Sequence, residues 1–140
     1  MPDPASITYR LGGALDVDAM ARLYDASTLA ERRPYDDPGR LARVLDGSDP
    51  VVTAWDGEHP VGIARCLSDF AYVTFVADLA VDRRYQRRGI GRALLAHVRE
   101  AVPGTQLVLL AAPAARAYYA RVGFARHDSA WTLEPHGPLA

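Results

Sequence analysis

The chain has 140 residues, a length that predicts about one domain with a sizeable hydrophobic core. Hydrophobic residues make up 49% and charged residues 24%, which is typical of a soluble globular protein. Because the formal net charge is -1, no overall basic field favours nucleic acid or a membrane surface as a partner.

All 16 residues counted as lysine or arginine are arginines. The lack of lysine excludes P-loop NTPases and enzymes that form a lysine Schiff base. The single cysteine, Cys66, lies in an apolar run, which predicts a buried inert thiol and suits a reducing, cytoplasmic compartment. The stretch MPDPASITYR lacks the features of a secretory leader, and no apolar run is long enough to span a bilayer.

The first third of the chain predicts one strand and two helices. Residues 7–11 form the expected strand, which two glycines end. Asp16 is expected to cap a helix whose apolar residues recur at i, i+3, i+4 and i+7. Residues 31–40 are rich in proline and charge and predict a loop, and a short helix is expected over residues 41–47.

Three strands are expected next, over residues 51–55, 61–67 and 70–81. The last of these is long and rich in aromatic and β-branched residues, so it is predicted to be the central strand. A helix should follow, because Ile90 and Leu94 begin an apolar stripe that ends before Pro103-Gly104.

The last third of the chain predicts a strand, a helix and a closing hairpin. Residues 106–111 are continuously apolar, as expected for a strand buried on both faces. A short helix is expected over residues 114–121, followed by strands over residues 124–127 and 130–133. The tail after Glu134 is expected to fray.

The stretch YQRRGIGRALL, residues 85–95, places glycines and arginines where a strand leads into a helix. Gly89 and Gly91 allow close approach of the backbone, and the first helical N–H groups and the helix dipole favour an anion. Arg87, Arg88 and Arg92 add positive charge. The stretch therefore predicts a phosphate or pyrophosphate cradle, although the third glycine of a dinucleotide-binding fingerprint is missing.

Two motifs in this order resemble those of the GNAT superfamily of N-acetyltransferases. LAVDRRYQRRGIGRALL is similar to its acetyl-CoA-binding motif, and QRRGIG matches the signature [Q/R]-x-x-G-x-[G/A]. ARAYYARVGF, residues 115–124, resembles the late helix motif A-x-x-x-Y-x-x-x-G-F. The resemblance covers roughly residues 51–133.

The resemblance implies an α/β fold that forms one domain over residues 1–140. A central mixed sheet, with splayed fourth and fifth strands, would be flanked by about four helices. The pantetheine arm of acetyl-CoA would lie between the splayed strands. The residues that the resemblance assigns to acetyl-CoA are Leu79, Ala80, Val81, Gln86, Arg87, Arg88, Gly89, Ile90, Gly91, Arg92 and Tyr119.

The family chemistry implies two catalytic candidates. Tyr119 matches the tyrosine near the thioester sulfur and could protonate the departing thiolate, or it could simply pack. Asp78 lies in an apolar strand end, so it could attract the amine or accept its proton, or it could be a structural carboxylate. Asp69 is a second candidate base, for which a turn is the simpler explanation. The four histidines lack metal-ligand spacing, so no metal site is expected.

The resemblance implies an acetyl-CoA-dependent N-acetyltransferase that acts on a primary amine by direct attack in a ternary complex. Arylalkylamines and polyamines are the favoured acceptors, and a homodimer is compatible with the family. The alternative is a non-catalytic acyl-CoA-binding sensor. Ala112 departs from the family pattern, because members often have an asparagine there that contacts acetyl-CoA.

Overall fold

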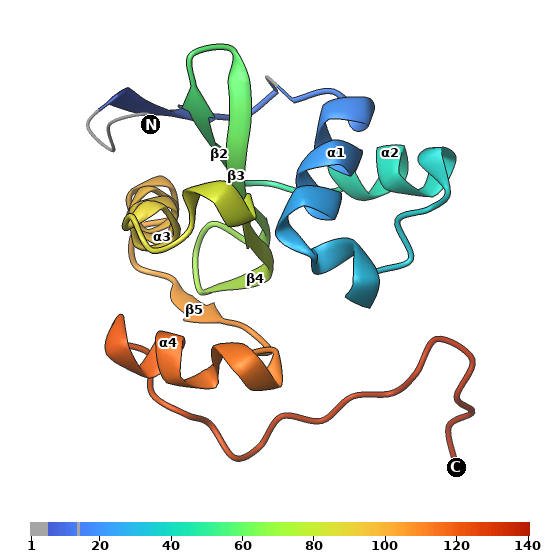
Figure 1. Ribbon diagram of the computed structural model, residues 1–140. Coiled ribbons are helices and arrows are strands. Elements are labelled where there is room, and N and C mark those ends of the chain that lie inside the picture. The colour runs from blue at the N-terminus through green and yellow to red at the C-terminus, as the bar shows by residue number, and fades with distance from the viewer. Residues whose placement is uncertain (1–5, 14) are drawn as a thin grey trace. The chain divides into compact units, whose positions relative to one another are not determined.

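The computed structural model describes residues 6–13 and 15–140. Residues 1–5, part of the stretch inspected for a leader, lie outside the described residues. The chain forms two compact units, residues 1–109 and residues 110–140 (Figure 1). The expectation of a single domain over the whole chain stays a prediction.

The first unit contains five strands and three α-helices among its described residues. The strands are β1 (Ile7–Leu11), β2 (Val51–Asp56), β3 (His59–Ser68), β4 (Val73–Val81) and β5 (Gln106–Val108). The helices are α1 (Val17–Ser27), α2 (Pro38–Asp46) and α3 (Ile90–Ala101), with short 3-10 turns η2 (Leu29–Arg32) and η3 (Arg83–Tyr85). The second unit contains η4 (Pro113–Ala115) and α4 (Arg116–Arg121).

The five strands form one mixed sheet in the order β1-β2-β3-β4-β5. The first four strands pair antiparallel, and β5 pairs parallel to β4. A parallel pair requires a crossover connection, which α3 supplies. The predicted α/β class with a mixed sheet is therefore confirmed.

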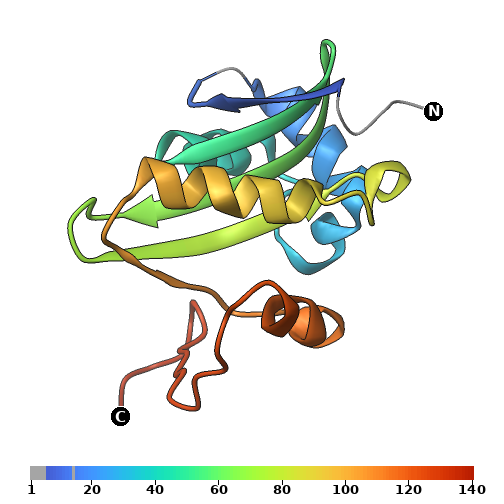
Figure 2. The same cartoon turned by 90° about the vertical axis from the view of Figure 1, so that its left-hand side faces the viewer.

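The helices of the first unit cover both faces of the sheet, with α3 on one face and α1 and α2 on the other (Figures 1 and 2). Neighbouring residues of β3 show this division, because side chains alternate along a strand. Ile63 belongs to the buried cluster that includes Met20, Leu23 and Tyr24 of α1. Gly62 instead faces α3, where Leu94 would contact any added side chain.

All three residues of β5 pair with β4, but only along the first part of β4. Val73, Thr74 and Phe75 pair with the three residues of β5, but β4 continues to Val81. Beyond Phe75, β4 has β3 alone as its strand partner among the described residues. The end of β5 leaves residues 76–81 of β4 without a partner on that side among the described residues, and the splay of the fourth and fifth strands that the resemblance implied stays a prediction.

The structure contains both helices that were predicted in the first third of the chain. Asp16 caps α1, where its Oδ1 accepts a hydrogen bond of 2.7 Å from the Ala19 N–H. The second helix begins earlier than predicted, at Pro38, because Asp37 caps it and proline suits a first helical turn. Gly47 ends that helix as expected.

Three strand predictions were wrong. The strand predicted to be central begins at Val73 instead of residue 70, because Asp69 holds residues 70–72 in a turn. It is also the fourth of the five strands, and β3 lies in the centre of the sheet. Strand β5 stops at Val108 and is partly exposed, since it pairs with β4 alone among the described residues.

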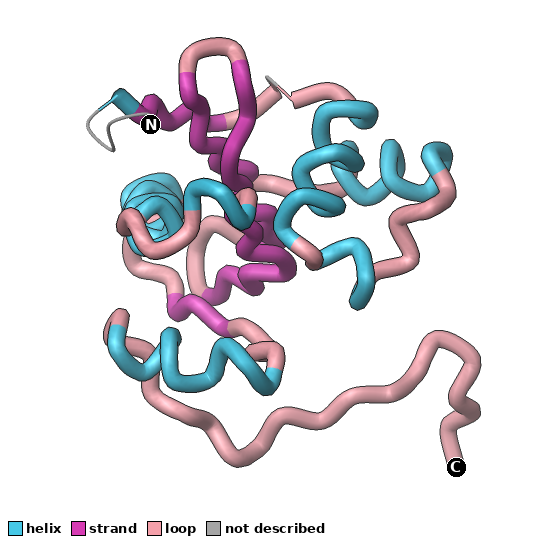
Figure 3. The backbone as a smooth tube through the Cα atoms, viewed as in Figure 1, coloured by secondary structure: helices cyan, strands magenta, loops and turns pink. Residues whose placement is uncertain are grey.

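The closing hairpin is absent from the described residues, and the chain after α4 runs as loop (Figure 3). A two-stranded hairpin is marginal without an apolar face to bury. Trp131, in the middle of the predicted second strand, is 92% exposed.

We expect Gly62→Val to destabilise the protein, because a Cβ at this position would lie 3.1 Å from Leu94 Cδ1 and 3.3 Å from Ile90 Cγ2. Overpacking costs about 1–3 kcal/mol, and replacing a strand glycine returns about 0.5–1 kcal/mol. The free energy of unfolding, measured in urea, should fall by about 1–2 kcal/mol on this balance. Gly13→Val is the matched control, because nothing lies within 4 Å of that position. Equal losses in the two variants would contradict the packing argument.

Candidate functional site

The turn after β4 is fixed by the buried carboxylate of Asp82. Its Oδ1 accepts hydrogen bonds from Arg84 N–H at 2.9 Å and Arg84 Nε at 3.2 Å, and its Oδ2 accepts one from Arg84 Nη2 at 2.9 Å. The Asp82 N–H donates to the Val61 carbonyl on β3. These contacts tie the start of the predicted phosphate loop to the end of the sheet.

The loop backbone then adopts a conformation that suits an anion. Arg87 and Gly89 both have left-handed backbones, with φ of 64° and 80°, and Arg88 between them does not. Alternation of this kind points successive N–H groups toward one concave side, where an anion can bind. A left-handed arginine costs about 1–3 kcal/mol of strain, and strain of this size is concentrated at functional sites.

Helix α3 adds further donors at the same place. It begins at Ile90, and Gly89 caps it without a side-chain hydrogen bond. The first-turn N–H groups have no intrahelical acceptor, and the helix dipole favours an anion beside them. The Arg88 guanidinium lies 5.2 Å from the centre of the Tyr85 ring. Residues 87–92 therefore combine backbone donors with exposed guanidinium groups.

The predicted cofactor residues of the first unit lie along one continuous path. Leu79, Ala80 and Val81 occupy the end of β4 that β5 leaves unpaired. Gln86 Nε2 donates a 3.0 Å hydrogen bond to the Val81 carbonyl and so joins this strand end to the loop. The structure thus brings the strand end, the loop and the N-terminus of α3 together, while acetyl-CoA binding by these residues stays a prediction.

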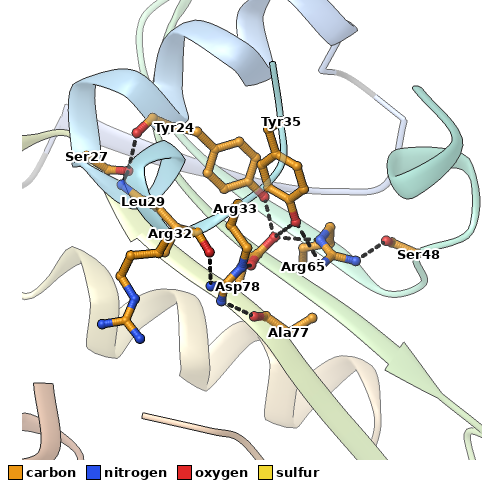
Figure 4. Close-up of polar contacts among 10 residues, drawn as sticks. All are labelled: Tyr24, Ser27, Leu29, Arg32, Arg33, Tyr35, Ser48, Arg65, Ala77 and Asp78. Atoms are coloured by element: carbon orange, nitrogen blue, oxygen red, sulfur yellow. Dashed lines mark hydrogen bonds and ion pairs between the residues drawn. The ribbon is translucent and has the colours of Figure 1, made fainter. Parts of the chain in front are cut away.

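Asp78 lies at the centre of a buried polar cluster (Figure 4). Its Oδ2 accepts hydrogen bonds from Arg65 Nε at 2.7 Å, Tyr24 Oη at 2.8 Å and Tyr35 Oη at 2.9 Å. Its Oδ1 accepts one from Arg33 Nε at 2.8 Å. These five residues, called the Asp78 cluster below, come from α1, β3, β4 and the segment between α1 and α2.

The surroundings of Asp78 make its carboxylate a weak base. Burial raises its pKa, but the Arg65 charge and the hydrogen bonds from Arg65, Tyr24 and Tyr35 outweigh burial and hold the pKa below its ordinary value. Oδ2 accepts three of these four hydrogen bonds and Oδ1 accepts one, so most of the acceptor capacity of the carboxylate is occupied. The geometry therefore favours the structural explanation of Asp78 over proton abstraction.

Asp69, the second candidate base, forms a turn. Its Oδ1 accepts hydrogen bonds from the N–H groups of Ala71, Tyr72 and Val73 at 2.7–3.1 Å. These backbone hydrogen bonds lower the pKa of the Asp69 carboxyl. This geometry favours a turn, the simpler of the two explanations of Asp69.

A cavity of about 660 Å³ opens beside the Asp78 cluster. One side is α1 and the other is the segment that follows η2. The lining residues are Ala21, Tyr24, Asp25, Glu31, Arg33, Pro34, Tyr35 and Asp36. Arg33 also donates a 3.1 Å hydrogen bond from Nη2 to the Ala77 carbonyl. Arg33 therefore lines the cavity and also contacts β4.

The second unit carries Tyr119 and Ala112. Tyr119 is half-buried on α4, and its ring centre lies 5.6 Å from that of Phe124 and 5.3 Å from that of Tyr118. Ala112 precedes η4. The role of Tyr119 near a thioester stays a prediction.

The remaining titratable candidates behave as structural groups. Burial raises the pKa of Cys66 to about 12, which fits the predicted inert thiol. His97 stacks on Tyr9 with ring centres 4.7 Å apart. Within residues 6–13 and 15–140, no group of three or more His, Cys, Asp or Glu side chains is placed to hold a metal ion, and no helix is long and apolar enough to cross a bilayer.

The donors around Asp78 were not predicted from the sequence. Tyr24 falls in the apolar stripe of α1, so its hydroxyl gave no separate signal, and Arg33 and Tyr35 lie in a loop. Arg65 could have been found, because it interrupts an apolar strand directly opposite Asp78 in the β3–β4 ladder. Opposite charges at facing positions of a hairpin are expected to pair.

An open strand edge beside a glycine-rich anion cradle is typical of proteins that bind a long ligand with a phosphate-bearing part. The profile of the Acetyltransferase (GNAT) family matches residues 17–124 of this chain. The chain therefore belongs to the GNAT family of acetyltransferases, which confirms the resemblance seen in its two motifs.

Known relatives agree with this assignment. An uncharacterised, ycf52-like N-acetyltransferase of Prochlorococcus marinus is 32% identical over 113 residues, which are 76% of this chain and 57% of that relative. The chain thus spans little more than half the length of this curated relative.

Solved structures share the fold. A GNAT family acetyltransferase of Streptococcus pneumoniae superposes with a TM-score of 0.70 at 26% identity, over 85% of this chain and 87% of that one. A putative acetyltransferase of Deinococcus radiodurans gives a TM-score of 0.76 at 19% identity, over 94% and 91% of the two chains. At that identity the second match shows the fold alone.

The Asp78 cluster should make the free energy of unfolding depend on pH. Because the pKa of Asp78 is lowered on folding, its contribution is present above the unfolded pKa, about 3.9, and is lost as pH falls through the folded pKa. Asp78→Asn should therefore lower the free energy of unfolding by about 3–5 kcal/mol at pH 7. The difference from wild type should shrink below about pH 4.

Urea unfolding at pH 3 to 7 measures this difference. Asp46→Asn, at the exposed end of α2, is the control and should change stability by no more than about 0.5 kcal/mol. A difference between wild type and Asp78→Asn that stays constant down to pH 3 would contradict the role of the ionised carboxylate.

Proposed function

We propose that this protein is an acetyl-CoA-dependent N-acetyltransferase that transfers acetyl to a small cationic primary amine. The observation that carries the proposal is the continuous path from the unpaired end of β4 to the nest at Arg87–Gly89 and the N-terminus of α3. The pantetheine amides would pair with the strand end, and the pyrophosphate would meet the backbone donors and guanidinium groups of residues 87–92.

The cavity between α1 and the segment after η2 supports a cationic acceptor. Asp25, Glu31 and Asp36 line it and are exposed, so three carboxylates outnumber the one guanidinium group of the lining, Arg33, which is bound to Asp78. Opposite charge attracts the ammonium form of an amine and raises its local concentration. Tyr35 is half-buried and packs on the fully buried Tyr24 with ring centres 4.9 Å apart, so the Tyr35 ring offers an aromatic contact that suits an arylalkylamine as well as a polyamine.

Direct transfer requires a neutral amine and a protonated thiol product. A lysine-like amine has a pKa of about 10.4, so it must lose a proton before its nitrogen attacks the thioester carbonyl. Since four donors occupy Asp78, water is the proton acceptor that the geometry favours. The carbon–sulfur bond then breaks, and the Tyr119 hydroxyl would protonate the departing thiolate. The products are an N-acetylated amine and coenzyme A.

Thiol release from acetyl-CoA tests the proposed activity directly. The panel contains tryptamine, spermidine, glucosamine 6-phosphate and a short peptide with a free N-terminus. Turnover of tryptamine or spermidine well above the peptide is the expected result. Calorimetric binding of acetyl-CoA without release from any of the four amines would favour the sensor alternative, and no binding would overturn the proposal.

We expect Gly89→Val to weaken acetyl-CoA binding. Gly89 has a φ of 80°, which a β-branched residue adopts with a strain of about 1–2 kcal/mol, so the loop should relax and lose its aligned N–H groups. Calorimetry should show a dissociation constant raised about tenfold. Gly57→Val is the matched control, because Gly57 is also left-handed, with a φ of 60°, but lies in the β2–β3 turn. An equal loss of affinity in both variants would contradict a specific role of the loop.

Tyr119→Phe should separate an enzyme from a sensor. Loss of general acid catalysis lowers kcat by about 10²–10⁴-fold, and affinity for acetyl-CoA should stay within about twofold, since the phenyl ring keeps its packing on Phe124. Tyr118→Phe, one residue away on α4, is the control and should keep kcat close to wild type. If Tyr118→Phe instead shows the loss, the motif assignment must shift by one residue. If neither variant changes kcat, Tyr119 is a packing residue.

A further inference from the structure

We propose that Asp78 is a positioning residue, which locks the segment between α1 and α2 against strand β4 and so maintains the shape of the amine-binding cavity. This inference rests on the proposed function in one respect, namely that the cavity receives the amine. In this role Asp78 does not transfer a proton. It affects binding of the amine and leaves binding of acetyl-CoA unchanged.

The segment between α1 and α2 supplies most of the cavity lining. Glu31, Arg33, Pro34, Tyr35 and Asp36 are five of its eight lining residues. Residues 33–37 form neither helix nor strand. A loop of this kind has several accessible conformations, so the shape of the cavity depends on the contacts that restrain it.

The restraining contacts converge on Asp78. Arg33 Nε and Tyr35 Oη donate to its two carboxylate oxygens at 2.8 and 2.9 Å. Arg33 also reaches the Ala77 carbonyl on β4. Figure 4 shows the side chains of Arg33 and Tyr35 pointing from the segment toward the carboxylate. The loop is thus held to β4 at two of its lining residues.

The charge of Asp78 keeps two guanidinium groups close to each other. The cluster contains two guanidinium groups, Arg33 and Arg65, and one carboxylate. Arg65 Nη2 also donates to Tyr35 Oη at 3.2 Å, and Nη1 donates to Ser48 Oγ at 3.0 Å. Without the carboxylate, two neighbouring cations would repel each other, and the more exposed one, Arg33, would move into water. The segment that carries Arg33 would then leave its position at the cavity wall.

A second variant separates this role from simple stabilisation of the fold. Tyr35→Phe removes one donor to Asp78 and one acceptor for Arg65 but leaves the carboxylate and the aromatic contact with Tyr24. It should therefore loosen the segment with little global destabilisation. Tyr72→Phe is the matched control, since Tyr72 is 75% exposed at the β3–β4 turn.

The test compares wild type, Asp78→Asn, Tyr35→Phe and Tyr72→Phe at pH 7. Backbone hydrogen exchange is measured over residues 29–37 and over α3. KM and kcat are measured with tryptamine and spermidine, and acetyl-CoA affinity is measured by calorimetry. We expect exchange in residues 29–37 to accelerate about tenfold in Asp78→Asn and Tyr35→Phe. KM for the amine should rise about tenfold in both variants. Exchange in α3 should stay within twofold in Tyr35→Phe and Tyr72→Phe, and the affinity for acetyl-CoA should stay within twofold in all variants.

Three results would overturn the proposal. The first is unchanged exchange in residues 29–37 in both variants. The second is a kcat loss above 100-fold in Asp78→Asn alone, with unchanged KM and loss of the acid limb of the pH profile, which would make Asp78 the base. The third is a parallel loss of amine and acetyl-CoA affinity, which would indicate global damage.

Failure of the proposed function gives a different result. If wild type binds acetyl-CoA but turns over neither amine, that outcome counts against the proposed substrate class. The exchange comparison does not need turnover. It then decides by itself whether Asp78 holds the segment to β4.

Discussion

A buried carboxylate is tolerated only when donors replace the water that it loses, and Asp78 imposes this condition on three separate parts of the chain. Its partners come from α1, from β3 and from the segment between α1 and α2. None of these partners is adjacent to Asp78 in the sequence, so the carboxylate fixes how they assemble on one face of the sheet. The Tyr24 hydroxyl illustrates the constraint, because it would be an unsatisfied group in the core without Asp78.

The proposed function places the opposite requirement on the part of β4 directly after Asp78, where backbone groups must stay available for a ligand. Beyond Phe75 the strand no longer pairs with β5, and its side chains alternate between buried and half-buried positions. A strand edge left open inside a fold is a liability unless something covers or pairs with it. An extended pantetheine arm is a ligand that can pair with such an edge, so the proposed function assigns the open edge of β4 and the anion cradle to the same extended molecule.

The sequence predicted the parts of this arrangement that depend on local chemistry. Glycine spacing and charge indicated the cradle at residues 87–92, and apolar periodicity indicated α1 and α3. It failed where the outcome depends on distant contacts. The apolar run at residues 106–111 reads as a buried strand, but β5 pairs with three residues of β4 and stops. Asp78 was visible as an anomaly in an apolar strand, whereas its donors in the loop were not, because nothing local distinguishes Arg33 or Tyr35 from solvent-exposed residues.

Asp78 on β4 and Asp82 in the turn after it have different structural roles. Asp78 organises the amine side, and Asp82 organises the turn that leads to the phosphate cradle. Four residues of strand separate them by about 13 Å, and their donors are different residues. Groups that are this far apart and share no partner contribute almost independently to stability and binding. The loop between α1 and α2 can therefore change to fit another amine without disturbing the cradle, which is a physical reason for one fold to serve many acceptors.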